Sequence, residues 1–140
     1  MSQVFLEIFE HKGIRYAEVI RAESRVKTTE FFSPAESSFQ FGLLAHTAGF
    51  VEAPHYHKEF ERVIRDLQQM FVVQRGVVDV DLYDDDGYLI KTVRLKQGDA
   101  IVLIHGVHAI KVIEDMQCIS VKQGPFLGAE NDKIMVNVKN

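Results

Sequence analysis

Residues 78–104, VDVDLYDDDGYLIKTVRLKQGDAIVLI, carry the clearest structural pattern in this chain. At its start, apolar Val78, Val80 and Leu82 alternate with more polar residues, as in a strand that packs one face on a core. The run Asp84-Asp85-Asp86-Gly87 then predicts a hairpin turn, because aspartate and glycine supply the backbone geometry that tight turns need. The stretch therefore predicts antiparallel strands joined by a short turn.

The same pattern continues outward from this hairpin. Residues 88–95 read as the returning strand, and Gln97-Gly98-Asp99 turns the chain into the apolar run 100–104. Glycines divide the rest of the chain into short segments rich in Val, Ile and Phe, which is typical of an all-β sandwich or barrel. Further strands are expected at residues 4–9, 15–20, 39–46, 70–74, 109–113, 118–121 and 134–138.

One segment has a different period. Phe60, Val63, Ile64 and Leu67 recur at helical spacing, and Glu61 forms an i,i+4 pair with Arg65 on the other face. We therefore expect a short helical loop near residues 59–67, projecting from the barrel.

Bulk properties restrict the class of protein. A length of 140 residues suits a single domain over residues 1–140. The net charge of -4 argues against a protein that coats nucleic acid or anionic membrane, so neither partner is expected. Cys118 is the only cysteine and reads as a buried structural thiol, which favours a reducing compartment. Without a signal-like start or an apolar run of membrane-spanning length, a cytoplasmic location is expected.

Two histidines stand one residue apart. In a strand, His55 and His57 would place both imidazoles on the same face, which makes half of a site for zinc, iron, nickel, cobalt or manganese. His108 is the candidate third ligand, because Gly106-Val107 before it would let a strand end bend toward the pocket. The pattern predicts a divalent metal ion as cofactor; the alternative is a polar pocket lined by histidines that holds no metal.

The spacing of these residues resembles that of the cupin superfamily. Gly49 followed by His55-Tyr56-His57, with Gly76 at the close, resembles the first cupin motif, and the run from Gly98 to His108 resembles the second. The resemblance covers residues 38–123. It implies a cupin-type double-stranded β-helix, or jelly-roll barrel, with the three histidines as metal ligands.

The chain departs from the family pattern at its carboxylate ligand. Counting back from Gly76 by the family's spacing gives Gln69, whose amide oxygen brings no negative charge. A site made of Gln69 and imidazoles should hold metal less firmly than a carboxylate site and should favour an anionic ligand. Glu61 is the alternative, since it lies at the family's distance after His57. The segment after the histidine pair is also longer than usual, and Ile104 replaces the usual proline of the second motif.

The C-terminal part carries a finer resemblance. The run from Ser120 to Phe126, followed by Asp132-Lys133, is similar to the tail of small WbuC-like cupins associated with bacterial cell-surface polysaccharide and sugar-nucleotide genes. This implies a small, sugar-derived ligand. Because cupins often pair through N-terminal strands, and residues 1–33 contain apolar β-type sequence, a homodimer is expected.

Further side chains are candidates for ligand binding. Lys58, Arg62 and Arg65 could form a basic rim that attracts a phosphate or carboxylate, or a solvated face paired with the acidic residues between them. The remaining candidates are His46, which could support the ligands from behind, and Tyr56 and His105, which could act as acid or base.

Three functions are open from the sequence. The first is a metal-dependent isomerase, epimerase or lyase acting on a small sugar-derived substrate, with the metal as Lewis acid. The second is a metal-dependent dioxygenase. The third is a non-catalytic sugar-binding or regulatory module. No residue can be assigned a catalytic role from the sequence.

Overall fold

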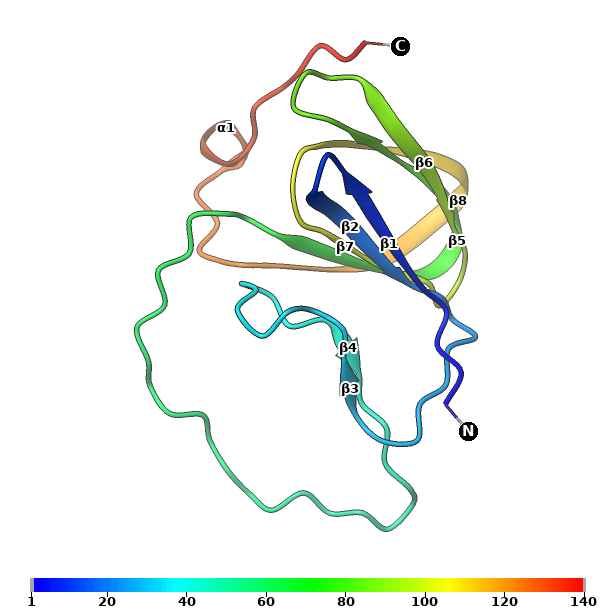
Figure 1. Ribbon diagram of the computed structural model, residues 1–140, viewed down its shortest axis with the longest axis vertical. Helices are drawn as coiled ribbons and strands as arrows, with labels where there is room; N and C mark the ends of the chain where they lie inside the picture. The colour runs from blue at the N-terminus through cyan, green and yellow to red at the C-terminus, as the bar shows by residue number, and fades with distance from the viewer. Residues whose placement is uncertain (1, 140) are drawn as a thin grey trace.

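The computed structural model describes residues 2–139, and antiparallel strands form nearly all of its regular structure (Figure 1). The predicted all-β class is therefore confirmed. The elements, in chain order, are β1 (Leu6–His11), β2 (Ile14–Ile20), β3 (Glu30–Phe31), β4 (Gly42–Leu43), β5 (Gln69–Tyr83), β6 (Leu89–Leu95), β7 (Ala100–Leu103), β8 (Val107–Lys122) and α1 (Ala129–Asp132).

One six-stranded sheet organises the fold. Its order is β1-β2-β7-β5-β6, with β8 paired to β5, while β3 and β4 form a separate two-stranded sheet. Strand β5 is long enough to pair with β7 through its first residues and with β6 through its last, and β8 follows it along nearly its whole length. The sheet curls into a half-barrel (Figure 1).

The hairpin predicted from residues 78–104 is confirmed. Val80 pairs with Val93 across β5 and β6, and the apolar side chains of both strands are buried on one face. In the turn, Oδ1 of Asp84 accepts hydrogen bonds from the backbone N–H of Asp86 at 3.0 Å and of Tyr88 at 2.9 Å. The acidic run therefore satisfies turn donors that the strands leave free.

Strand β5 bends sharply at Gly76. The pairing between β5 and β8 shifts register around this residue, which has a φ of 83°. A Cβ atom here would lie 2.1 Å from the carbonyl oxygen of Asp115 on β8, closer than any side chain tolerates. Glycine lets the two strands remain paired through the bend, so the expected strands 70–74 and 78–83 are two arms of one element. Likewise, 109–113 and 118–121 are parts of β8.

Two cores lie on opposite faces of the sheet. Ala17 and Val19 of β2 belong to the first core, whereas Ile20 and Val102 belong to the second, as the alternation of strand side chains requires. The segment around β3 and β4 covers the second core with Phe32, Phe39 and Phe41. Cys118, which we expected to be buried, is half-buried against the first core, and burial raises the pKa of its thiol.

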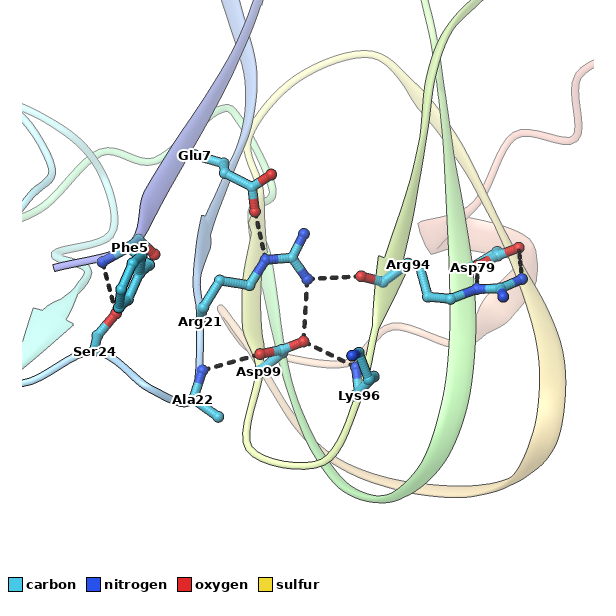
Figure 2. A network of polar contacts seen from close by, with 9 residues as sticks. All are labelled: Phe5, Glu7, Arg21, Ala22, Ser24, Asp79, Arg94, Lys96 and Asp99. Atoms are coloured by element: carbon cyan, nitrogen blue, oxygen red, sulfur yellow. Dashed lines mark hydrogen bonds and ion pairs between the residues drawn. The ribbon is translucent and has the colours of Figure 1, made fainter.

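The Gly98-Asp99 turn is fastened by a polar network (Figure 2). Oδ1 of Asp99 accepts from the backbone N–H of Ala22 at 2.9 Å, and Oδ2 accepts from the backbone N–H of Lys96 at 2.9 Å and from Nη1 of Arg21 at 3.1 Å. Arg21 also contacts the carboxylate of Glu7. One buried carboxylate thus joins the end of β2 to the turn between β6 and β7.

The helix predicted near residues 59–67 is wrong, although the segment does project from the sheet as a loop (Figure 1). Residues 51–65 have no regular secondary structure, and α1 is the only helix among residues 2–139. The side chains that would form its apolar face are unpacked, with Phe60 70% and Val63 73% exposed. So short a helix is marginal unless its apolar face packs against something. The expected strand 39–46 shortens to β4, and 134–138 forms no strand.

Candidate functional site

A pocket of about 240 Å³ opens where β7 ends and β5 and β8 begin. Its position follows from the bend in β5. Gln69 is the first residue of β5, whereas His108 pairs with Leu82 near the other end of that strand. Because β5 and β8 curl together at Gly76, both ends of the pairing reach the same pocket. The residues that line it include Asp66, Leu67, Gln69, Leu103, His105 and His108.

His108, the second residue of β8, is one of the two imidazoles that line this pocket. Burial lowers the pKa of His108 below its usual value, and the positive charge of Lys133 lowers it further. Both effects favour the neutral imidazole at pH 7. The neutral ring is the form that binds a metal ion or accepts a hydrogen bond.

Gln69 is held by its amide nitrogen. Nε2 donates a hydrogen bond to Oγ of Ser120 on β8 at 2.9 Å, which leaves the amide oxygen to face other partners. Asp66, which the sequence did not single out, also lines the pocket. Hydrogen bonds from Ser38 and Gln68 lower the pKa of Asp66. Nothing in its sequence neighbourhood distinguishes Asp66 from an ordinary loop carboxylate.

His105 lines the same pocket just before β8. Its Nε2 lies 2.9 Å from Oδ1 of Asp85 in the β5–β6 turn, and its ring packs edge-on against Tyr16 at 5.2 Å between centroids. The acidic turn of the hairpin therefore orients a histidine at the pocket. Since Nε2 faces a carboxylate, Nδ1 is the ring atom left for other contacts.

His55 and His57 lie elsewhere, in the long segment 44–68 that swings away from the sheet (Figure 1). Their ring centroids are 5.4 Å apart. Nδ1 of His55 lies 2.9 Å from the carbonyl oxygen of Ala53. Because a carbonyl oxygen only accepts, this contact fits the tautomer in which Nδ1–H donates and Nε2 keeps its lone pair. The pair is thus adjacent, as the spacing predicted, but exposed and outside the pocket.

The other candidates belong to this same outlying segment and do not line the pocket. The ring of His46 stacks on Phe50 at 3.9 Å, and the guanidinium of Arg62 lies 5.3 Å from the ring centre of Phe60. Tyr56 is 90% exposed. Glu61, Lys58 and Arg65 are exposed as well.

The four predicted ligands therefore lie in two separate places, two in each. Gln69 and His108 share the pocket, and His55 and His57 share the segment. Within residues 2–139, no group of three or more His, Cys, Asp or Glu side chains is placed to hold a metal ion.

Comparison of the chain with family models, with curated proteins and with solved structures gave no match. The resemblance to cupins therefore rests on the residues and spacings quoted above. None of the helices in the described part of the chain combines the length and apolarity needed to cross a membrane.

Proposed function

We propose that this protein is a metal-binding barrel protein of the cupin type, which binds or acts on a small, sugar-derived, anionic ligand. The proposed metal ligands are His55, His57, Gln69 and His108. One observation carries the proposal: Gln69 and His108, both selected by motif spacing, line the same pocket. They do so although Gln69 begins β5 and His108, on β8, pairs with Leu82 near the end of β5.

The donor atoms suit a divalent ion of intermediate softness. His108 is kept neutral by its surroundings, and Gln69 has an amide oxygen to offer. The contact between His55 and Ala53 sets the tautomer in which Nε2 can coordinate. Imidazole nitrogens with one neutral oxygen favour zinc, nickel, cobalt or iron over magnesium or calcium.

Completing the site requires the segment 44–68 to bring its histidine pair to the pocket. This segment ends at the pocket, since Asp66 and Leu67 are lining residues and Gln69, which also lines it, follows directly in β5. The histidine pair is therefore tethered to the pocket by a short stretch of chain. Its many exposed apolar side chains, such as Phe60 and Val63, would lose water contact on closing.

The charges around the pocket favour an anionic ligand. Lys133 is close enough to lower the pKa of His108, and the four proposed ligands are all neutral, so among residues 2–139 Asp66 is the one carboxylate of the pocket lining that offsets the charge of the ion. When bound, the metal would supply a Lewis acid that polarises a carbonyl or hydroxyl group. His105, oriented by Asp85, is the residue placed to hold or move a proton at Nδ1.

The test is metal binding by protein first stripped with a chelator. Calorimetric titration with Zn²⁺, and the visible spectrum after Co²⁺ addition, should show one site with imidazole ligands. His55→Ala and His108→Ala should each weaken binding, whereas His11→Ala, which removes a histidine of β1 outside the ligand set, should not. Unchanged affinity in His108→Ala would overturn the site assignment, and absence of binding by the natural chain would overturn the proposal.

The homodimer also stays a prediction. Strand β1 is an end strand of the six-stranded sheet and pairs with β2 on one side only among the described strands. A second copy could pair along its free edge. Light scattering measures the mass directly, and a monomeric mass at high concentration would remove this prediction.

A further inference from the structure

A second cavity, of about 280 Å³, lies on the other face of the sheet. Gln68 and Val102 line it, whereas their neighbours Gln69 and Leu103 line the pocket described above. Consecutive residues of an extended chain point to opposite faces, so the two spaces lie on opposite faces of the sheet, and Ile104 is the one described residue that lines both. A second wall of this cavity is the segment before β4, with Ser33, Pro34, Ser37 and Phe39, and a third is the β1–β2 hairpin.

Glu18 is the unusual residue of this cavity. It stands in the centre of β2, and its side chain is only 1% exposed. Oε1 accepts a hydrogen bond from Nη1 of Arg15 at 2.6 Å. Oε2 is also buried, and among residues 2–139 it has no hydrogen-bond partner.

A buried carboxylate oxygen without a donor is rare, because it has lost water and gained nothing in exchange. No donor in the described part of the chain satisfies Oε2, yet Glu18 lines an open cavity. A group that enters the cavity and donates a hydrogen bond to Oε2 would complete the pairing. The unpaired Oε2 therefore indicates that a ligand of this cavity should carry a hydrogen-bond donor.

We propose that this second cavity is a binding site for a neutral polyhydroxyl compound, one hydroxyl of which donates a hydrogen bond to Oε2 of Glu18. A hydroxyl can at once donate to the carboxylate and accept from the neighbouring guanidinium of Arg15. An ammonium group would be repelled by the positive charge of that guanidinium. An anion would be repelled by the carboxylates of Glu18 and of Glu10, which also lines the cavity.

The walls suit the rest of such a ligand. Pro34 and Phe39 offer apolar surface for the C–H face of a sugar or cyclitol ring. Binding sites for small molecules commonly combine an apolar wall with a few polar groups that fix orientation. The volume limits the ligand to about a single ring. This site does not depend on the proposed metal site, which lies on the other face.

The experiment is a titration followed by ¹H–¹⁵N correlation spectra of the full chain. D-glucose and myo-inositol serve as polyol probes, ethylammonium as the cationic probe and inorganic phosphate as the anionic probe. The polyols should give saturable shifts at the amides of Ser37 and Phe39. Glu18→Gln should weaken this binding about tenfold or more, as expected for loss of a hydrogen bond to a charged group.

A second pair of variants tests the cavity without changing Glu18, because substitution of that buried residue could itself disturb the fold. Ser37→Trp fills the cavity from its loop wall and should abolish the shifts. Glu36→Trp adds the same bulk at the adjacent residue, which is exposed and does not line the cavity, and should leave them. The proposal is overturned if no polyol gives saturable shifts, if Ser37→Trp or a folded Glu18→Gln binds as the natural chain does, or if ethylammonium or phosphate binds instead.

Discussion

Arg15 and Glu18 form an ion pair in which only the acid is buried: Nη1 lies 2.6 Å from Oε1, and the exposed fractions of the two side chains are 28% and 1%. Arg15 therefore provides the charge that compensates a carboxylate on the covered face of β2. Desolvating a carboxylate costs free energy, which a well-placed guanidinium offsets.

Removal of Arg15 alone should destabilise the protein. Arg15→Met leaves the carboxylate of Glu18 buried and unpaired, at a cost of about 3 kcal/mol in the free energy of unfolding. The double variant Arg15→Met/Glu18→Leu removes both charges and should recover most of this loss. Urea unfolding at pH 7 measures both changes. A double variant as unstable as the single one would contradict this account of the pair.

The bend at Gly76 should tolerate no side chain. Gly76→Ala brings Cβ to 2.1 Å from the backbone of β8, and should lower the free energy of unfolding by more than about 3 kcal/mol. Gly13→Ala is the matched control, because Gly13 also has a positive φ of 77° but a Cβ atom there would meet nothing within 4 Å. That variant should cost only about 1 kcal/mol. Equal losses would show that φ alone, and not the close approach of β8, sets the requirement.

Acid should weaken the pairing of β5 with β8 through Asp81. Burial raises the pKa of Asp81, but hydrogen bonds from Lys111 and Thr92 outweigh it, so the folded-state pKa lies below the ordinary 3.8. A lowered folded-state pKa stabilises the fold above the unfolded-state pKa, and this stability is lost as the pH falls through the folded-state value.

Lys111→Met should therefore reduce stability at neutral pH, and its deficit should shrink between about pH 5 and pH 2. Lys91→Met, at an exposed lysine of β6, serves as the control and should follow the pH dependence of the natural chain. Thermal unfolding followed by circular dichroism across this range measures the difference. A deficit that stays constant with pH would mean that Asp81 and Lys111 are not coupled.

Gln69→Glu should strengthen metal binding at the proposed site. A carboxylate in place of the amide offsets part of the ion's charge, and we expect about a tenfold lower Kd for Zn²⁺, on the order of 1.4 kcal/mol. Gln74→Glu adds the same charge at an exposed position of β5 and controls for a general electrostatic effect. Equal gains in both variants would argue against Gln69 as a ligand.

Metal should also protect the segment 44–68 from proteolysis. Trypsin cleaves after Lys58, Arg62 and Arg65, all of which are exposed in this segment. If His55 and His57 join the pocket, saturating Zn²⁺ should slow cleavage at these sites in the natural chain but not in His108→Ala. Mass spectrometry of timed digests identifies the sites. Cleavage rates that are the same with and without Zn²⁺ would contradict closure of the segment.

The histidine pair shows what the spacing of residues in the sequence can and cannot predict. The separation of His55 and His57 predicted adjacent rings, and the rings are adjacent. Spacing could not predict where the segment that carries them would lie, because that depends on packing between distant parts of the chain. The helical period of residues 60–67 was misleading for the same reason: amphipathic residues form a stable short helix only against a partner surface.

The all-β class, the hairpin around Asp84 and the turn at Asp99 could be predicted from the residues alone, because strand alternation and turn hydrogen bonds are set by residues close together in the chain. The folded structure was needed to show that Gln69 and His108 line one pocket, and that Glu18 is buried with one oxygen unpaired among the described residues. Those relationships arise from the curl of the sheet and the segment that covers it, and no local pattern encodes either one.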